Sequence, residues 1–176
     1  MADVVHEPPV SGDDGLPAVP ASASALIFDG RRQLLILRPT YKSGWTIPGG
    51  VMENDGETPW QACQREVREE CGLQVRTGRL AAVDYRRPRP ARDGRPERAG
   101  GIRFLFECGV ADDAALAALA LQPDEIAQSM LAPLTSALPL LRGPVRRRVQ
   151  AACAADGTVY LEDGRPVRQV GRTLLA

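Results

Sequence analysis

The chain has 176 residues, of which 44% are hydrophobic and 25% are charged, and its formal net charge is zero. These values are ordinary for one soluble globular domain, and a neutral chain has no overall field that attracts nucleic acid or a membrane surface. No apolar run approaches the roughly 20 residues that a membrane-spanning helix needs. Composition therefore excludes a membrane partner and disfavours nucleic acid.

Histidine and cysteine, which often carry catalysis, offer little here. The one histidine, His6, lies in segment 1–22, which is rich in Pro and Asp. Such a segment buries too little surface to offset its ordering entropy, so we expect a flexible acidic tail there and a single domain over 23–176. Ser-His-Asp and Cys-His catalysis are then excluded. The cysteines show neither a CxxC pair nor a zinc pattern, which is typical of a cytoplasmic protein.

The domain is expected to mix strands and helices. Apolar runs predict strands at 24–28, 33–37, 74–85, 102–110, 158–161 and 166–170. Segment 112–121 is expected to form a short helix or an ordered loop, and helical segments are expected at 124–141, with interruptions at Pro133 and Pro139, and at 144–155. An Asp-Gly pair between the first two runs and another between the last two indicate hairpins. The elements show no regular βαβ rhythm, so the class is α/β (α+β), with helices around a sheet.

One helix is especially well marked, and it begins at Pro59. Thr58 suits the N-cap, Gln61 completes a capping box with it, and Gly72 suits a left-handed C-cap. At 100° per residue, one face carries the apolar residues Trp60, Cys63, Val67 and Cys71, and the neighbouring face carries Glu66, Glu69 and Glu70. We expect the helix to pack on a core by the first face and to present carboxylates by the second.

Three glutamates on one helix face most often mark a solvated surface. Here, however, the sequence Pro48-Gly49-Gly50 precedes the helix, and glycines let backbone groups approach a metal or a phosphate closely. Carboxylates without histidine or cysteine suit Mg²⁺, a hard cation that takes oxygen ligands, with Mn²⁺ as the alternative. The stretch therefore predicts a metal-binding loop and helix.

Segment Gly50–Leu73 resembles the Nudix box, G-x5-E-x7-R-E-U-x-E-E-x-G-U, where U is a bulky aliphatic residue. From Glu57 onward the match has no gap, but six residues instead of five separate Gly50 from Glu57. The resemblance implies the Nudix fold, an α/β/α sandwich with a central mixed sheet. It also implies Mg²⁺-dependent hydrolysis of a nucleoside diphosphate that is linked to another group.

The resemblance further implies roles for individual residues. The metal ligands would be Gly50 through its carbonyl, Glu66, Glu69 and Glu70. Glu57 and Arg65 would brace the loop against the helix and orient those ligands. One of the helix glutamates or a glutamate from a later loop would take the proton from water, and Glu125 is the candidate for the later group. The alternative for Glu125 is an acid that interacts with the dipole at a helix N-terminus.

Signals for the substrate are weaker. Tyr41 and Trp45 would be able to stack on a base, although packing explains Trp45 better. An arginine-rich loop contains Arg86, Arg87, Arg89, Arg92, Arg95 and Arg98. Arg86 and Arg87 lead it as candidates to clamp phosphates, and a solvated loop is the alternative. A second basic group near the last helix is expected to face solvent or a homodimer contact: Arg142, Arg146, Arg147 and Arg148.

Three hypotheses for the function follow. The first is an enzyme that hydrolyses a small nucleotide derivative, such as a modified nucleoside triphosphate, a nucleotide sugar or an ADP-ribose-like compound, and the complete glutamate set favours it. The second is a binding module that senses a nucleotide, which the extra loop residue keeps open. The third is removal of pyrophosphate from RNA 5′ ends, which requires the arginine loop to face the site.

Overall fold

The structure is a computed structural model that describes residues 19–90, 100–168 and 170. His6 and most of the expected acidic tail lie outside these residues, as do Arg92, Arg95 and Arg98 of the arginine-rich loop. The first strand begins at Ala21. The first strand of the described residues therefore begins within segment 1–22, which composition assigned to the tail.

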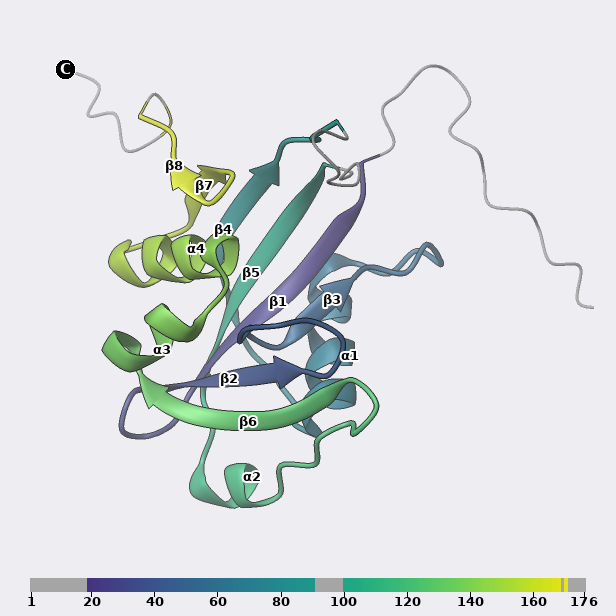
Figure 1. Ribbon diagram of the computed structural model, residues 1–176, viewed down its shortest axis with the longest axis vertical. Coiled ribbons are helices and arrows are strands. Elements are labelled where there is room, and N and C mark those ends of the chain that lie inside the picture. Colours follow the sequence, from purple (N-terminus) through teal and green to yellow (C-terminus); the bar gives the residue numbers. More distant parts are fainter. Residues whose placement is uncertain (1–18, 91–99, 169, 171–176) are drawn as a thin grey trace, which may run out of the picture.

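Strands and helices alternate irregularly along the described chain. In order they are β1 (Ala21–Phe28), β2 (Gln33–Pro39), β3 (Gly49–Val51), α1 (Pro59–Cys71), β4 (Arg79–Arg86), β5 (Gly101–Val110), α2 (Asp113–Ala117), β6 (Ile126–Pro133), α3 (Leu134–Leu140), α4 (Gly143–Ala154), β7 (Val159–Glu162) and β8 (Arg165–Pro166). They form one sheet in the order β6-β2-β1-β5-β4-β7-β8, with β3 also paired to β1 (Figure 1). The pairs β1–β5 and β4–β7 are parallel and the other pairs are antiparallel. The predicted mixed sheet is thus confirmed.

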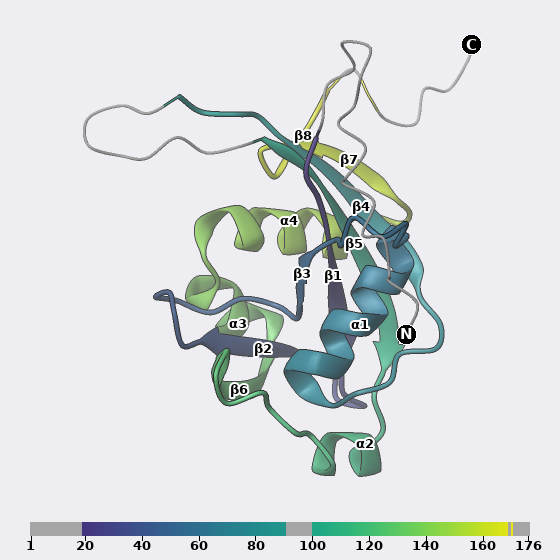
Figure 2. The ribbon, with the colours of Figure 1, turned by 90° about the vertical axis from the view of Figure 1, so that its right-hand side faces the viewer.

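Helices cover both faces of the sheet. Figure 2 shows α1 on one side of the central strands and α3 and α4 on the other. Side chains alternate between the two faces of a strand, so β1 sends Ala25 and Ile27 toward α1 and Leu26 toward α4. On the α1 side these residues meet Cys63 and Val67, both fully buried. The architecture is therefore an α/β/α sandwich with an apolar core on each side of the sheet.

Helix α1 forms as its sequence predicts. Thr58 Oγ1 accepts a hydrogen bond from the Gln61 amide at 3.3 Å, and Gln61 Oε1 accepts one from the Thr58 amide at 2.9 Å, which completes the capping box. Gly72 has a φ of 70°, and its N–H donates to the Arg68 carbonyl. These capping interactions are local, so the helix can form with these ends whatever its tertiary packing.

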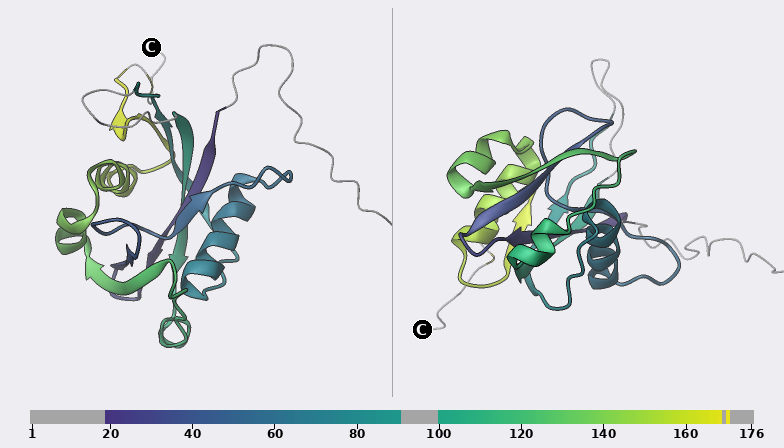
Figure 3. Two further views of the ribbon diagram at one scale, coloured as in Figure 1. Left: turned by 45° about the vertical axis from the view of Figure 1, so that its right-hand side comes forward. Right: turned by 90° about the horizontal axis from the view of Figure 1, so that it is seen from below.

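The prediction of a helical segment over 124–141 is wrong in its first half. Residues 126–133 form β6, which lies beside β2 at the edge of the sheet (Figure 3) and pairs with it from Gln33↔Pro133 to Pro39↔Ile126. This segment contains good helix formers, but pairing with the open edge of β2 satisfies its backbone groups and overrides that weak local preference. Helix α3 begins only at Leu134 and contains Pro139 near its end.

The other predicted elements need smaller changes. The strand expected at 74–85 begins only at Arg79, and the last hairpin ends at Pro166. Both Asp-Gly hairpins form, and Asp29 Oδ1 accepts hydrogen bonds from the amides of Arg31 and Gln33 at the first turn. None of the described helices combines the length and the apolar character needed to cross a bilayer.

Candidate active site

The glycine pair of β3 meets two glutamates of α1. The Gly49 amide donates a hydrogen bond to Glu70 Oε2 at 2.7 Å. Gly50 lies against the other carboxylate, because a Cβ added there would come within 2.2 Å of Glu66 Oε1. Strand β3 is fixed in this position by its antiparallel pairing with β1. The missing side chain at Gly50 therefore makes room for the Glu66 carboxylate, whereas the one at Gly49 lets β3 approach Ala23 and Ser24 of β1 and brings the Gly49 amide to Glu70.

Arg65 connects the loop before α1 to the helix. Its Nε and Nη2 bind both carboxylate oxygens of Glu57 at 2.8 and 3.1 Å, and Nη2 also donates to the Val51 carbonyl at 3.0 Å. Its Nη1 contacts Glu66 Oε1 at 3.0 Å and Glu69 Oε2 at 2.9 Å. The hydrogen bonds that Arg65 donates to Glu57 lower the pKa of the Glu57 carboxyl. One guanidinium thus holds three carboxylates and a carbonyl in a fixed arrangement.

The extra residue between Gly50 and Glu57 is accommodated away from the glycine pair. Residues 53–56 are all exposed, and the turn closes through two hydrogen bonds, from the Glu53 amide to Glu57 Oε2 and from the Glu57 amide to Asp55 Oδ1. Gly56 has a φ of +94°, and a Cβ there would touch nothing within 4 Å. The longer turn projects into solvent, so the contacts of Glu66 and Glu70 with β3 are kept.

Burial dominates the electrostatics of the two glutamates nearest β3. Glu70 is only 5% exposed, and its burial raises its pKa to about 7 against the opposing hydrogen bond from Gly49. Burial also raises the pKa of Glu66, and Arg65 opposes that shift. The charge of Glu125 adds to both increases. Carboxylates therefore crowd a partly dehydrated volume, where each raises the cost of ionising the others.

Glu125 reaches this group from the turn before β6. Its carbonyl accepts a hydrogen bond from the Thr40 amide at 2.8 Å, and the nearby Gln122 amide donates to the Glu70 carbonyl at 3.4 Å. Because β6 follows it, Glu125 does not begin a helix, and that alternative explanation is wrong. Lys42 was not predicted as part of the site; its charge lowers the pKa of Glu70, and its Nζ lies 4.6 Å from the centre of the Tyr41 ring. No local pattern marks a loop lysine for such a contact.

The donor set fits a hard divalent cation. Its titratable groups are five carboxylates and two cations: Glu57, Glu66, Glu69, Glu70 and Glu125, with Arg65 and Lys42. Among the described residues no three carboxylate, cysteine or histidine side chains converge into a ready ligand cluster. The cause is visible, since Arg65 engages Glu66 and Glu69 while Gly49 engages Glu70. The surplus of negative charge and the oxygen-only donors nevertheless suit Mg²⁺.

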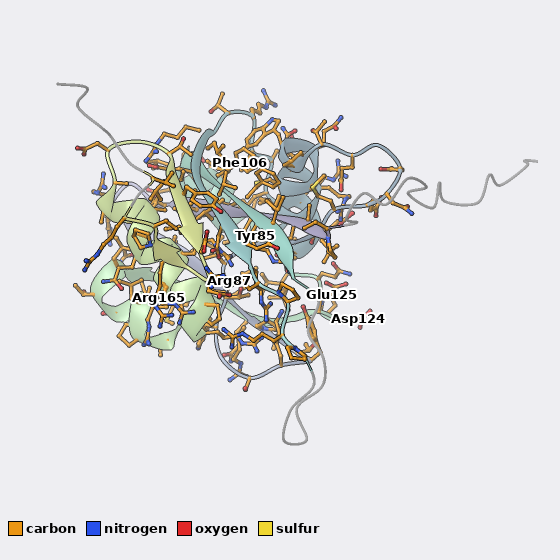
Figure 4. All side chains as sticks on the ribbon, turned by 90° about the horizontal axis from the view of Figure 1, so that it is seen from above. Tyr85, Arg87, Phe106, Asp124, Glu125 and Arg165 are labelled. Atoms are coloured by element: carbon orange, nitrogen blue, oxygen red, sulfur yellow. The ribbon has the colours of Figure 1, made fainter. Side chains whose placement is uncertain are left out.

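The residues predicted to bind the substrate lie in several different places. Tyr41 is 67% exposed, whereas Trp45 packs against the core on the α4 side, as its packing interpretation predicted. Arg87 forms an ion pair with Glu162 and lies near Arg165 at the β7–β8 hairpin (Figure 4). Arg86 lies on the face of the sheet opposite α1, as described below.

The basic group near the last helix is only partly as expected. Arg142 and Arg146 are exposed, but Arg147 Nη2 donates to the Asp163 carbonyl at 2.8 Å. Arg148 is buried, and its Nε binds Asp84 Oδ2 at 3.0 Å. The expectation that Arg148 faces solvent or a dimer contact is therefore wrong, because its position on α4 turns it toward the sheet.

Comparison with known proteins identifies the class. The NUDIX domain family matches residues 19–153, so the chain belongs to this family, and the Nudix-box resemblance is confirmed. A MutT protein from Bacillus halodurans has the same fold, with a TM-score of 0.62 at 19% identity over 81% of this chain and 87% of that one. A UDP-X diphosphatase gives a TM-score of 0.62 at 20% identity over 86% and 70%. The predicted Nudix fold is thereby confirmed.

Sequence relatives match over shorter stretches. The human (Homo sapiens) diphosphoinositol polyphosphate phosphohydrolase 3-alpha is 41% identical over 64 residues, which cover 35% of this chain and 38% of that protein. A MutT-like protein from Streptomyces ambofaciens is 34% identical over 108 residues, which cover 58% and 62%. The chain thus spans between about two fifths and three fifths of the length of these two relatives.

Gly50→Ala should separate the fold from the site. The added methyl group would displace the flexible carboxylate of Glu66 without straining the backbone, so we expect a folded protein whose kcat/KM falls roughly 100-fold, as a misplaced group about 1 Å away can cause. Circular dichroism and steady-state kinetics would check this. Gly30→Ala is the matched control, because a Cβ at Gly30 touches nothing within 4 Å. Equal activity in both variants would contradict the role of Gly50.

Proposed function

We propose that the chain is a metal-dependent pyrophosphohydrolase, which cleaves the phosphoanhydride bond of a nucleoside diphosphate linked to another group. The observation that carries this proposal is the contact between β3 and α1. There the Gly49 amide binds the Glu70 carboxylate, and Gly50 lies against the Glu66 carboxylate. The names of relatives support it, since they include a diphosphoinositol polyphosphate phosphohydrolase and a putative ADP-ribose pyrophosphatase from Bacillus subtilis.

In this proposal four groups hold the cation, which is Mg²⁺ or alternatively Mn²⁺: the Gly50 carbonyl, Glu66, Glu69 and Glu70. When bound, the cation neutralises the diphosphate oxygens and lowers the pKa of water. Arg65 and Glu57 keep the loop and α1 in register, so the glutamates hold their positions relative to β3. The hydrogen bonds from Gly49 to Glu70 and from Arg65 to Glu66 orient these two carboxylates before a ligand arrives.

We assign the general base to Glu125. It is exposed, so it can exchange a proton with water, and its charge already acts on Glu66 and Glu70. Glu125→Gln should lower kcat roughly 100- to 10,000-fold while KM changes little, since only proton transfer is lost. The neighbouring Asp124→Asn should leave kcat within about twofold. A Glu125→Gln enzyme with normal kcat would return the role of base to a helix glutamate.

One experiment separates the three functional classes. The protein is incubated with Mg²⁺ and a panel that contains a modified nucleoside triphosphate, a nucleotide sugar, ADP-ribose and a 5′-triphosphate RNA, and released phosphate or pyrophosphate is measured. We expect turnover of a small molecule that Glu66→Gln abolishes. Binding without any release would favour a nucleotide sensor instead, and release only from RNA would favour an RNA 5′-pyrophosphohydrolase.

The domain layout, the location and the partner of the chain are also proposals. We propose one catalytic domain that follows an acidic tail, a reducing cytoplasm as its location, and a small-molecule nucleotide derivative as its partner. The cysteines support the location, since all four are free thiols, with Cys63 and Cys71 buried. The exposed Arg142 and Arg146, at the start of α4, remain the candidate surface for a homodimer contact.

A further inference from the structure

A cluster of arginines lies on the face of the sheet opposite α1. This arginine cluster consists of Arg86 on β4, Arg103 on β5 and Arg148 on α4, grouped around Asp84. The pairing of β4 with β5 places Asp84 beside Arg103 and Arg86 beside Gly101, so these side chains share one face. Leu105 belongs to the core on the α4 side, and Arg103, two residues before it, points to the same side.

Asp84 balances only one of the three guanidinium groups. Its Oδ2 accepts a hydrogen bond from Arg148 Nε at 3.0 Å, and its Oδ1 accepts one from the Gly164 amide at 2.8 Å. Both oxygens are therefore engaged, and Asp84 is 1% exposed. Arg148 is held in place by this pair. Three arginines and one aspartate leave a surplus of two positive charges.

Arg103 carries the unbalanced charge. Within the part of the chain that the structure describes, its Nη1 is buried and has no hydrogen-bond partner. The guanidinium lies over Gly101, where an added Cβ would come within 3.1 Å of Nη1. Burial lowers the pKa of Arg103, and the charges of Arg148 and Arg86 lower it further. A buried donor without a protein partner is costly, and a ligand with acceptor oxygens would remove that cost.

Strand β5, which carries Arg103, lies two strands from β3 of the candidate active site. Ser22 of β1 pairs with Arg103 on one side and with Val51 of β3 on the other. Two strand spacings, or roughly 10 Å, therefore separate the backbone of β3 from that of β5. Gly49, whose amide binds Glu70, pairs with Ser24, and the half-buried side chain of Ser24 lies on the same face as the arginines.

We propose that Arg103 and Arg86 bind a phosphate group of the substrate other than the diphosphate that is cleaved. Guanidinium groups bind phosphate oxygens through paired N–H donors, and a phosphate would both supply the acceptor for Nη1 and offset the surplus charge. Arg148, fixed by Asp84, is a positioning residue that keeps the cluster positive. This inference rests on the proposed function and narrows its substrates to diphosphates with a further phosphate on the part that does not react.

Binding of inorganic pyrophosphate in EDTA tests the cluster directly. Without a divalent cation the glutamates of α1 repel anions, so the difference in calorimetric titration between the wild type and an arginine variant reports on that arginine. We expect Arg103→Gln and Arg86→Gln to weaken binding at least 10-fold. Arg31→Gln, which removes one exposed charge from the β1–β2 turn at the other end of β1, should change it less than twofold.

Thermal stability gives a second readout that a structural arginine would not produce. In phosphate-free buffer Arg103→Gln should raise Tm by about 2 °C, because it removes an unbalanced, partly buried charge. If Arg103 instead stabilised the fold, Tm would fall. Arg103→Lys retains the charge without the paired donors, so it should bind pyrophosphate with intermediate affinity.

The result that overturns the proposal is equal pyrophosphate affinity in the wild type and Arg103→Gln, or a lower Tm of the variant in phosphate-free buffer. Neither measurement uses turnover, so each remains readable even if no substrate is hydrolysed and the proposed function fails. Where the panel yields substrates, Arg103→Gln should raise KM at least 10-fold for one with a further phosphate. For a substrate without the further phosphate, the rise in KM should be clearly smaller.

Discussion

Glu70→Gln should make the metal-free protein more stable and, at the same time, abolish Mg²⁺-dependent hydrolysis. Glu70 is nearly completely buried, and burial raises its pKa from about 4.5 to about 7. At neutral pH the folded protein therefore carries a carboxylate whose ionisation opposes folding. Glutamine keeps the shape and can still accept the hydrogen bond from Gly49, but it carries no charge.

The direction of the pH dependence follows from the raised pKa. The folded state binds the proton of Glu70 more tightly than the unfolded state, so the free energy of unfolding falls as pH rises from about 4.5 to about 7. The difference between Glu70→Gln and the wild type should accordingly be small near pH 4.5 and about 1 to 3 kcal/mol at pH 8. In a chain of this size that corresponds to a Tm increase of roughly 2 to 10 °C.

Calorimetry in EDTA at pH 5 and pH 8 would measure this difference. Glu69→Gln is the matched control, because Glu69 is 44% exposed and pairs with Arg65, so its removal should not stabilise the protein. Added Mg²⁺ should stabilise the wild type but not Glu70→Gln, since a ligand that binds only the folded state raises its stability. A Glu70→Gln protein that is less stable than the wild type at pH 8 would refute this electrostatic account.

The sequence was most informative where the determinants are local. Helix α1 is specified by Thr58 and Gly72 at its ends and by an apolar stripe between them, so its bounds and its carboxylate face could be predicted. The strand at 126–133 could not be predicted, because its partner, β2, lies some 90 residues earlier in the chain and supplies the open edge. Local propensity carries no information about such an edge.

The same distinction applies to the sites. Glu66 and Glu70 lie one turn apart on a helix, and sequence spacing alone places them together. Lys42 and Arg103 gain their surroundings from the tertiary fold, and nothing near them in the sequence marks them. For Arg148 the local pattern was misleading. A run of arginines indicates a solvated surface, but the packing of α4 on the sheet buries Arg148 against Asp84.

Asp84→Ala should cause the largest loss of stability of any change considered. It would leave Arg148 buried without a counter-charge and the Gly164 amide without an acceptor. Breaking a buried ion pair by removing one partner typically costs about 3 to 5 kcal/mol, because the remaining charge stays dehydrated. Urea unfolding should show this decrease in the free energy of unfolding, with a Tm lower by about 10 °C. The partly exposed pair of Arg79 with Glu107 provides the control, and Glu107→Gln should cost less than about 1 kcal/mol.

A double variant decides whether the cost of Asp84→Ala comes from the stranded charge or from lost packing. Asp84→Leu combined with Arg148→Met removes both charges and fills much of their volume with apolar atoms. Replacement of a buried pair by apolar residues is often neutral, so the double variant should recover most of the stability that Asp84→Ala loses. If the double variant is as unstable as the single one, the hydrogen bond from Gly164 to Asp84 is the main contribution, and the pair serves chiefly to anchor the β7–β8 hairpin. If stability returns, folding does not require the ion pair. Its role would then be to hold Arg148 in the arginine cluster.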